Sequence, residues 1–392
     1  MKNNKYILYG ISFLQGLVFY GAFSVVFREN RGLGLNDIFL LEGIFVIFIM
    51  IFEIPWGIIG DKIGYKKTLV ISYGLFLVSK TIFYFSYSFL GFFMEALLSS
   101  LAISGISGCD SAIIYSSIDE KESDKVFGIY GFCGTLGFLV AALTGSIIVK
   151  ISIDLLAFIT IFPYTLAFLL AMFLRDVKNH KSKKDGNNKK ENLKDTFKIV
   201  LKDKNILLFI VAIGILNETT HSICVFLNQP LYIKSGVSLK WFGILTAFMQ
   251  VATFISLKSY KIKMIIGVKN LYKISIFIII LCNLILIVSG EAYLTILIIF
   301  LIEGGYALTQ PITETIKNKS IESLNRATIL SIYSMIENII ASLINFIISI
   351  ASKISMEWAL ITSLIFNILV FILIICYFYS KKKLTIVKEN LI

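Results

Sequence analysis

The sequence predicts an all-α membrane protein with 12 transmembrane helices, arranged as two pseudo-symmetric bundles of six. Three observations predict this fold. First, 57% of the 392 residues are hydrophobic and 16% are charged, whereas soluble domains hold about 45–50% and about 25%. Second, the apolar residues form runs of about twenty, the length that crosses a bilayer core of roughly 30 Å. Third, one polar segment divides these runs into six and six.

Each predicted span is an apolar run bounded by charged or turn residues. The first six spans cover approximately residues 6–28, 37–60, 67–88, 90–116, 126–149 and 153–175. The last six cover 205–232, 239–258, 270–289, 292–316, 327–351 and 356–379. The first run is full length and has no cleavage site, so we expect it to remain in the mature protein.

The segment between the sixth and seventh spans differs from the rest. Its sequence, DVKNHKSKKDGNNKKENLKD, is polar, rich in lysine and nearly free of large apolar residues. A segment of this composition cannot bury a core, so it is predicted to be a linker. The predicted domains are an N-terminal six-helix bundle (1–175), a cytoplasmic linker (176–204) and a C-terminal six-helix bundle (205–392).

The lysines and arginines indicate how the spans are oriented. With a cytoplasmic N-terminus, 30 of the 37 Lys and Arg lie in cytoplasmic segments, six lie outside, and Lys80 alone lies within a span. This bias predicts that both termini and the linker are cytoplasmic, in a multi-pass protein of the cell (plasma) membrane. Because the net charge of +12 lies in these loops and not on a soluble face, no nucleic-acid partner is expected.

Sites for metals, cofactors and catalysis are not expected. The five cysteines are scattered through the apolar runs and no pair has metal-ligand spacing, so they are interpreted as small buried hydrophobes. The nucleotide-binding pattern GxxxxGK[ST] is absent. No spaced set of His, Asp and Glu indicates catalysis, so the chain is not predicted to be an enzyme.

An internal repeat supports two related halves. RGLGLNDIF (31–39) aligns with SGVSLKWFG (235–243), which pairs Gly32 with Gly236 at an offset of 204. DKIGYKK (61–67) aligns with MIIGVKN (264–270), which pairs Gly64 with Gly267 at an offset of 203. The agreement in order and offset indicates two parallel repeats, an arrangement found in six-plus-six transporters.

The loop after the second span carries a family motif. Its pattern, Gly57-x-x-x-Asp61-Lys62-x-Gly64-x-Lys66-Lys67, resembles the signature loop of the major facilitator superfamily (MFS). The preceding Glu53-Ile54-Pro55 resembles a variant common among bacterial members that are often described as drug exporters. The resemblance extends over the whole chain through its twelve spans and long central loop. It implies a secondary transporter that works by alternating access.

The residue types in this motif have a physical interpretation. Gly57 is expected to let a neighbouring helix approach closely, and Gly64 to permit a tight turn. By the resemblance, Asp61 engages the cytoplasmic end of span 11 and holds the outward-open state. The lysines then lie on lipid headgroups or in the same network. The second copy departs from the pattern, because Met264 stands where Asp61 would align, and span 5 lacks the Gly-Pro signature of many drug/proton antiporters.

Polar residues follow single faces of several spans. Asn217, His221, Cys224 and Asn228 have the 0, 4, 7, 11 spacing of one helical face, and Glu303, Tyr306, Gln310 and Glu314 follow 0, 3, 7, 11. A third stripe in span 11 includes Asn338 and Asn345. In the superfamily, spans 1, 4, 7 and 10 line the central cavity. The substrate-cavity candidates are Gln15, Tyr20, Tyr115, Asn217, Asn228, Tyr306, Gln310 and Asn338.

Ionisable groups within spans are candidates for proton coupling. Each costs on the order of 2.5–3.5 kcal/mol at a helix centre, so its retention indicates a use. The candidates are Glu53, Asp110, Glu218, His221 and Glu303. Two alternatives stay open here: His221 as a hydrogen-bonded structural group, and Glu218 or Glu303 as the ion-pair partner of Lys80.

We expect proton-coupled export of small amphiphilic organic compounds, because the interior is apolar and aromatic, with few fixed charges. The alternative is proton-coupled import of a nutrient such as a sugar, peptide or metabolite, for which the amide and serine stripes would supply hydrogen bonds. The expected partners are a small-molecule substrate, protons or another ion, and the lipid bilayer. A monomer is expected.

Overall fold

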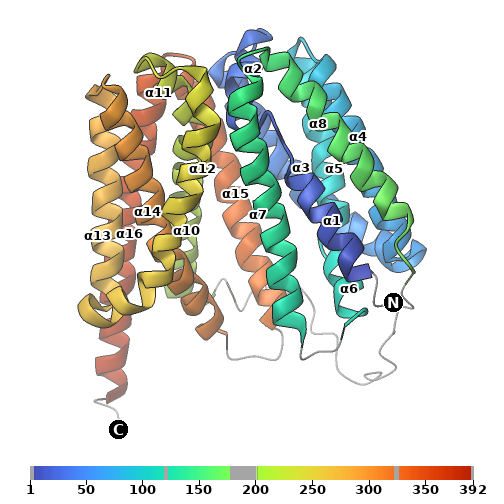
Figure 1. Cartoon of the computed structure of the whole chain (residues 1–392). Coiled ribbons are helices and arrows are strands. Elements are labelled where there is room, and N and C mark those ends of the chain that lie inside the picture. Colours follow the sequence, from blue (N-terminus) through green and yellow to red (C-terminus); the bar gives the residue numbers. More distant parts are fainter. Residues whose placement is uncertain (1–3, 119–121, 177–199, 201, 322–325, 390–392) are drawn as a thin grey trace, which may run out of the picture. The chain divides into compact units, whose positions relative to one another are not determined.

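The computed structural model describes residues 4–118, 122–176, 200, 202–321 and 326–389 (Figure 1). The described residues form helices joined by turns. The helices of the first half are α1 (Asn4–Gly16), η1 (Gly21–Phe23), α2 (Ser24–Asn30), α3 (Leu35–Ile63), α4 (Tyr65–Phe85), α5 (Phe89–Ile106), α6 (Cys109–Tyr115), α7 (Ser123–Ile148) and α8 (Ile153–Met172). Those of the second half are α10 (Lys204–His221), η3 (Ser222–Leu227), α11 (Asn228–Lys234), η4 (Leu239–Trp241), α12 (Phe242–Ala252), η5 (Thr253–Lys258), α13 (Ser259–Val288), α14 (Ala292–Lys319), α15 (Arg326–Ser352) and α16 (Met356–Glu389).

Among the described residues, 11 helical segments are long and apolar enough to cross a membrane. Ten of them correspond to single predicted spans, with ends that differ from the predictions by a few residues. The remaining segment, Leu239–Val288, has 50 residues, more than twice the roughly 20 that one crossing needs. It contains the predicted spans 8 and 9, so the segments together account for twelve crossings. The predicted linker lies largely outside the described residues.

Side chains at the starts of several helices satisfy backbone donors that the helix itself leaves unpaired. Ser152 accepts a hydrogen bond from the Asp154 N–H at 3.1 Å at the start of α8. Asp203 accepts from the N–H groups of Asn205 and Ile206 at the start of α10. These residue types favour helix N-termini because their oxygens reach the free N–H groups of the first turn. The helix starts therefore follow from local sequence.

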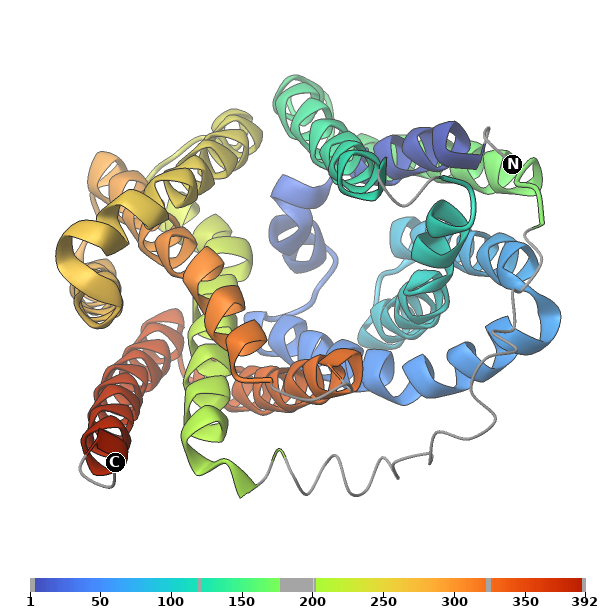
Figure 2. The same cartoon turned by 90° about the horizontal axis from the view of Figure 1, so that it is seen from below.

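The described residues divide into two compact units. The first lies within Met1–Gly186 and Ser238–Ala247, and the second within Asn187–Val237 and Phe248–Ile392. In the first unit, α1 packs against α7 and α8, and α4 packs against α5 and α8 (Figure 2). In the second, α10 packs against α15 and α16, and α13 against α14 and α16. These are the equivalent pairs when the first helix of one unit is matched to the first of the other.

The paired glycines of the internal repeat share one backbone conformation. The φ angles of Gly32 and Gly236 are 89° and 77°, and those of Gly64 and Gly267 are 93° and 78°. Around Gly32, the N–H of Leu33 donates to the carbonyl of Arg28, and the N–H of Asp37 donates to that of Gly34. The same two bonds recur at an offset of 204 residues, where Val237 donates to Tyr232 and Trp241 donates to Ser238. Positive φ favours glycine, so the repeat in sequence is also a repeat in backbone structure.

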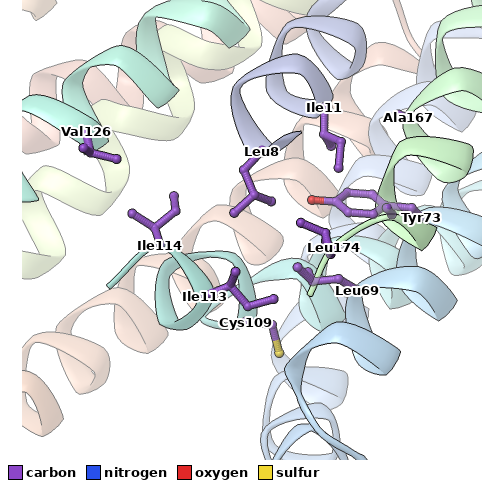
Figure 3. Packing of buried hydrophobic residues seen from close by; sticks show 11 residues of the cluster. Leu8, Ile11, Leu69, Tyr73, Cys109, Ile113, Ile114, Val126, Ala167 and Leu174 are labelled. Carbon is purple, nitrogen blue, oxygen red and sulfur yellow. The ribbon is translucent and has the colours of Figure 1, made fainter. Parts of the chain in front are cut away.

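The apolar core at one end of the first unit holds five helices together. Its members are supplied by α1, α4, α6, α7 and α8 together with the residue just beyond α8: Leu8, Ile11, Leu69, Tyr73, Cys109, Ile113, Ile114, Val126, Ala167, Ala171 and Leu174 (Figure 3). Close packing of helices against lipid depends on such interdigitation, because lipid tails are as apolar as the side chains themselves. The core therefore fixes α6, which follows a break in the fourth span at Gly108.

Candidate functional site

A hydrogen-bonded polar network lies inside the second unit. Gln310 on α14 donates from Nε2 to Oδ1 of Asn217 on α10 at 3.4 Å. Asn345 on α15 donates from Nδ2 to Oε1 of Glu218 at 2.8 Å. The same Glu218 oxygen lies 3.5 Å from Nδ1 of His221, one helical turn further along the chain. Residues of the predicted stripes of spans 10 and 11 thus each contact span 7, at the neighbouring positions Asn217 and Glu218.

The charge of Glu218 is largely withdrawn from water. Its side chain is buried, whereas that of His221 is 42% exposed. A buried carboxylate needs partners that stabilise its charge, and a carboxamide donor and an imidazole provide them. Glu218 and His221 thus place a carboxyl group and an imidazole, both protonatable groups, within 3.5 Å of each other.

Glu303 belongs to the same side of the second unit. It lies half-buried on α14 and interacts with the thiol of Cys224, and its charge also acts on Tyr306 and His221. Asn228 is buried, and its Oδ1 has no hydrogen-bond partner among the described residues. Glu314, the last member of the predicted span 10 stripe, is exposed and pairs with Lys317 at 3.2 Å.

The prediction of one polar face assumed a regular helix in span 7, but the helix there is irregular. Residues Ser222–Leu227 form a π-helical segment between α10 and α11. A π-helical turn inserts an extra residue, so it shifts the face that residues beyond it occupy. Asn217 and His221, which precede the π-helical segment, are half-buried. Cys224 within that segment and Asn228 directly after it are buried. The 0, 4, 7, 11 stripe is therefore interrupted at Ser222.

A second group of buried charges lies in the first unit. Glu95 on α5 lies 3.3 Å from Nζ of Lys80 on α4 and 3.7 Å from Arg28 on α2. Ser99 donates to Glu95 at 2.8 Å. Lys80 and Glu95 are only 8% and 4% exposed. The predicted cavity residue Tyr20 is buried beside this group, where its ring lies 5.8 Å from the Lys80 ammonium.

An ion pair of Lys80 with Glu218 or Glu303 was an open alternative from the sequence. That alternative is wrong, because the partner of Lys80 is Glu95. Neither Glu95 nor Arg28 was among the sequence candidates, although a signal was present. Lys80 stands five residues before the end of α4, and Glu95 stands six residues after the start of α5. Since helices rise 1.5 Å per residue, two antiparallel neighbours place these side chains at the same depth.

Asp110 accepts a hydrogen bond from the Tyr130 hydroxyl at 2.9 Å and lies half-buried in the first turn of α6. Gln15 is half-buried, and its Nε2 is buried without a partner among the described residues. Tyr115 is 56% exposed, so it does not line a packed interior. Asn338 is half-buried on α15.

Two glycines of the signature loop carried structural expectations. Gly64 has a φ of 93° and joins α3 to α4, so it makes the expected tight turn. At Gly57, no described atom lies within 4 Å of where a Cβ would stand, and the close approach expected there stays a prediction. Within the first unit, α3 is approached closely at Gly60, where a Cβ would lie 3.3 Å from Cys109 Sγ. Gly60 is buried.

The rest of the loop is at the surface. Asp61, Lys62 and Lys67 are exposed, Lys66 is half-buried, and Asp61 interacts with Tyr65 one turn further on. Glu53, a proton-coupling candidate, is exposed as well. The assignment of Asp61 as a gating residue stays a prediction.

These features define a class of protein. In the described part of the chain there are eleven segments of membrane-crossing length, two units with the same helix pairing, and ionisable groups buried inside each unit. These are the features of a polytopic solute transporter. Residues 6–346 match the sequence pattern of the Major Facilitator Superfamily, and the chain belongs to that family.

Curated relatives carry the same general description. The chain is 31% identical over 157 residues to an "Uncharacterized transporter" of Buchnera aphidicola subsp. Baizongia pistaciae (strain Bp), a match that covers 38% of this chain and 39% of the relative. It is 29% identical over 137 residues to another from Buchnera aphidicola subsp. Schizaphis graminum (strain Sg), with 33% and 34% covered. The matched segment therefore spans little more than a third of these relatives.

Solved transporters share the whole fold. The nucleoside transporter NupG matches with a TM-score of 0.78 at 18% identity, over 97% of this chain and 99% of that chain. A bacterial homologue of the human lysosomal transporter Spinster, inward-facing and unoccupied, has a TM-score of 0.75 at 12% identity, over 95% and 96%. A POT family transporter in complex with 5-aminolevulinic acid has a TM-score of 0.74 at 13% identity, over 97% and 96%.

Proposed function

We propose that this protein imports a small polar organic solute together with protons. The observation that carries the proposal is the polar network of the second unit, where Asn217 meets Gln310 beside the Glu218–His221 pair. Amide side chains offer both donors and acceptors, which suit a solute that presents several hydrogen-bonding groups. An amphiphilic compound would instead favour an apolar site. Amphiphile export therefore ranks second; it rests on the apolar, aromatic interior with few fixed charges and on the Glu-Ile-Pro variant.

The structural neighbours support the polar choice. Those proteins are described as a nucleoside transporter and as a POT family transporter bound to 5-aminolevulinic acid. Both named solutes are small, polar and rich in hydrogen-bonding groups. A bacterial membrane maintains an inward proton gradient, so a solute that moves with protons in the same direction accumulates inside.

The proposed roles follow from burial and bonding. Glu218 and His221 share the transported proton, because Oε1 of Glu218 lies 3.5 Å from Nδ1 of His221 and Glu218 is buried. Asn345 holds Glu218 in place through the 2.8 Å bond. Asn217 and Gln310 contact the solute. Glu303 is a second acid that the proton can reach, since its charge acts on His221.

Replacing Glu218 with glutamine should abolish concentrative uptake and leave exchange of solute across the membrane intact. One pH unit corresponds to about 1.4 kcal/mol, which sustains about tenfold accumulation when one proton moves with each solute molecule. In proteoliposomes with an imposed gradient, the variant should reach only the external concentration. Glu122→Gln, which alters an exposed acid paired with Lys5, is the matched control and should accumulate normally. Normal accumulation by Glu218→Gln would contradict the assigned proton site.

Replacing Asp61 with asparagine should slow transport several-fold without changing the affinity for solute. The proposed reason is that Asp61 stabilises one of the two alternating states and takes no part in binding. Initial uptake rates and equilibrium binding, measured on the same preparations, separate these effects. An unchanged rate would remove Asp61 from the gating mechanism, and a loss of affinity would place it in the binding site.

A further inference from the structure

The buried charges of the first unit border a cavity that the uptake mechanism above does not use. The cavity has a volume of about 180 Å³, far more than the roughly 10–15 Å³ that holds one water molecule. Arg28, Lys80 and Glu95 line it together with Tyr20, Ser99 and Glu42. The rest of its wall is mainly apolar and includes Ile38, Leu41, Phe45 and Phe76.

We propose that this cavity binds the carboxylate of a small organic anion, and that Glu95 takes up a proton when the anion enters. The two cations supply the recognition. A guanidinium and an ammonium are the groups that bind carboxylates most strongly, through charge-assisted hydrogen bonds. The apolar wall suits the carbon skeleton of an organic ligand and would not suit a hydrated inorganic ion.

The contacts of Arg28 leave room for such a ligand. Nη2 of Arg28 lies 3.7 Å from Oε2 of Glu95, which is longer than a charge-assisted hydrogen bond. Its Nε is buried and has no hydrogen-bond partner among the described residues. A buried donor without a partner is costly, so a ligand oxygen that accepted from it would be favoured. The guanidinium lies over the rings of Phe83 and Phe92, which fix its position.

The proton follows from the charges around Glu95. Arg28 and Lys80 face it from α2 and α4, and Glu42 on α3 lines the same cavity. The two bases balance the two acids, so an additional anion would leave an uncompensated negative charge in a buried site. Protonation of one acid removes that charge. Glu95 is the acid that bridges both cations, and its protonation frees them for the ligand.

The uncharged neighbours of Glu95 fit this exchange. Ser99 can remain bonded to a protonated Glu95, because a hydroxyl both donates and accepts. The hydroxyl-bearing rings of Tyr20 and Tyr164 lie 5.8 and 5.7 Å from the Lys80 ammonium and Phe76 lies 4.9 Å from it. These rings hold the Lys80 ammonium by cation–π contact when the carboxylate of Glu95 becomes neutral.

The test is thermal stability and calorimetric binding of the full chain in a carboxylate-free buffer of constant ionic strength. The probes are acetate, lactate and succinate, with their uncharged amides as matched ligands. At least one acid should bind and its amide should not. Because one proton enters with the anion, affinity should rise by up to about tenfold per unit fall in pH. Binding by none of the acids, or equal binding by the amides, would overturn the proposal.

Variants connect the binding to these residues. Glu95→Gln keeps both cations and should bind the acid with no pH dependence, whereas Glu42→Gln should keep the pH dependence. The double variant Lys80→Gln/Glu95→Gln removes one charge of each sign and so protects folding. It should bind about tenfold or more weakly, as expected for a lost charge-assisted hydrogen bond. The control Arg31→Gln/Asp154→Asn removes the 2.6 Å pair outside the cavity and should bind like the parent. Equal binding by both double variants would contradict the site.

The same carboxylate could be the transported solute or a separately bound ligand. Uptake of the labelled acid into proteoliposomes identifies it as the solute, and binding without uptake identifies a resident ligand. Failure of all solute uptake would contradict the proposed function and would leave the measurement of carboxylate binding unaffected.

Discussion

Replacing Gly137 with valine is expected to lower the melting temperature markedly and to reduce the yield of folded protein. At Gly137 on α7, an added Cβ would meet the backbone oxygen of Phe13 on α1, and at Gly16 it would meet the backbone oxygen of Gly134. Backbone atoms cannot rotate away as a side chain can, so the two helices must separate. Overpacking costs about 1–3 kcal/mol and occasionally more, a large part of the roughly 5–15 kcal/mol of a typical domain.

The matched control is valine at Gly131, on the same helix. No described atom lies within 4 Å of the position of a Cβ there, so that variant should fold normally. Yield of monodisperse protein and melting temperature in detergent are the measurements. Equal melting of the two variants would show that α1 and α7 do not pack as described.

Replacing Lys80 with methionine should cost about 3 kcal/mol of stability, the lower end of the about 3–5 kcal/mol typical of a broken buried pair. The lower end is expected because Arg28 and Ser99 still contact Glu95. Adding Glu95→Gln to Lys80→Met should recover most of the loss, since the buried charge that lacked its partner is then gone.

The reference pair is Lys234 with Glu357, which are 2.6 Å apart and both 39% exposed. Breaking a surface pair of this kind costs about 0–1 kcal/mol, so Lys234→Met should melt close to the parent. Unfolding in denaturant, compared among the four proteins, provides the measurement. A Lys80 variant as stable as the Lys234 variant would mean that Glu95 is not buried as described.

The sequence predicted the spans well because bilayer thickness sets their length. Ten segments match single predicted spans within a few residues, and the repeat was visible at Gly32, Gly64, Gly236 and Gly267 because each adopts a positive φ. Length and backbone conformation are properties that single residues or local runs determine. They can therefore be inferred without knowledge of which helices are neighbours.

Contacts between helices were predicted less well. The close approach at Gly60 was not predicted, since the sequence does not say which face of α3 is covered within the first unit. The partner of Lys80 was missed because only distant acids were considered. Glu95 lies on the next helix along the chain, at the same depth as Lys80. The π-helical segment at Ser222–Leu227 leaves no recognised pattern in sequence, and it changed the face of span 7.

We propose that a polar solute and protons cross the membrane in the same direction. Proteoliposomes that contain a pH-sensitive dye test it directly, with nucleosides, small carboxylates, sugars and dipeptides added outside in turn. We predict that at least one of these solutes accumulates while the lumen acidifies, and that Glu218→Gln loses both signals. Co-transport of a polar solute with protons would be contradicted if amphiphilic compounds alone evoked proton movement, in the direction opposite to their own, or if polar solutes crossed without protons.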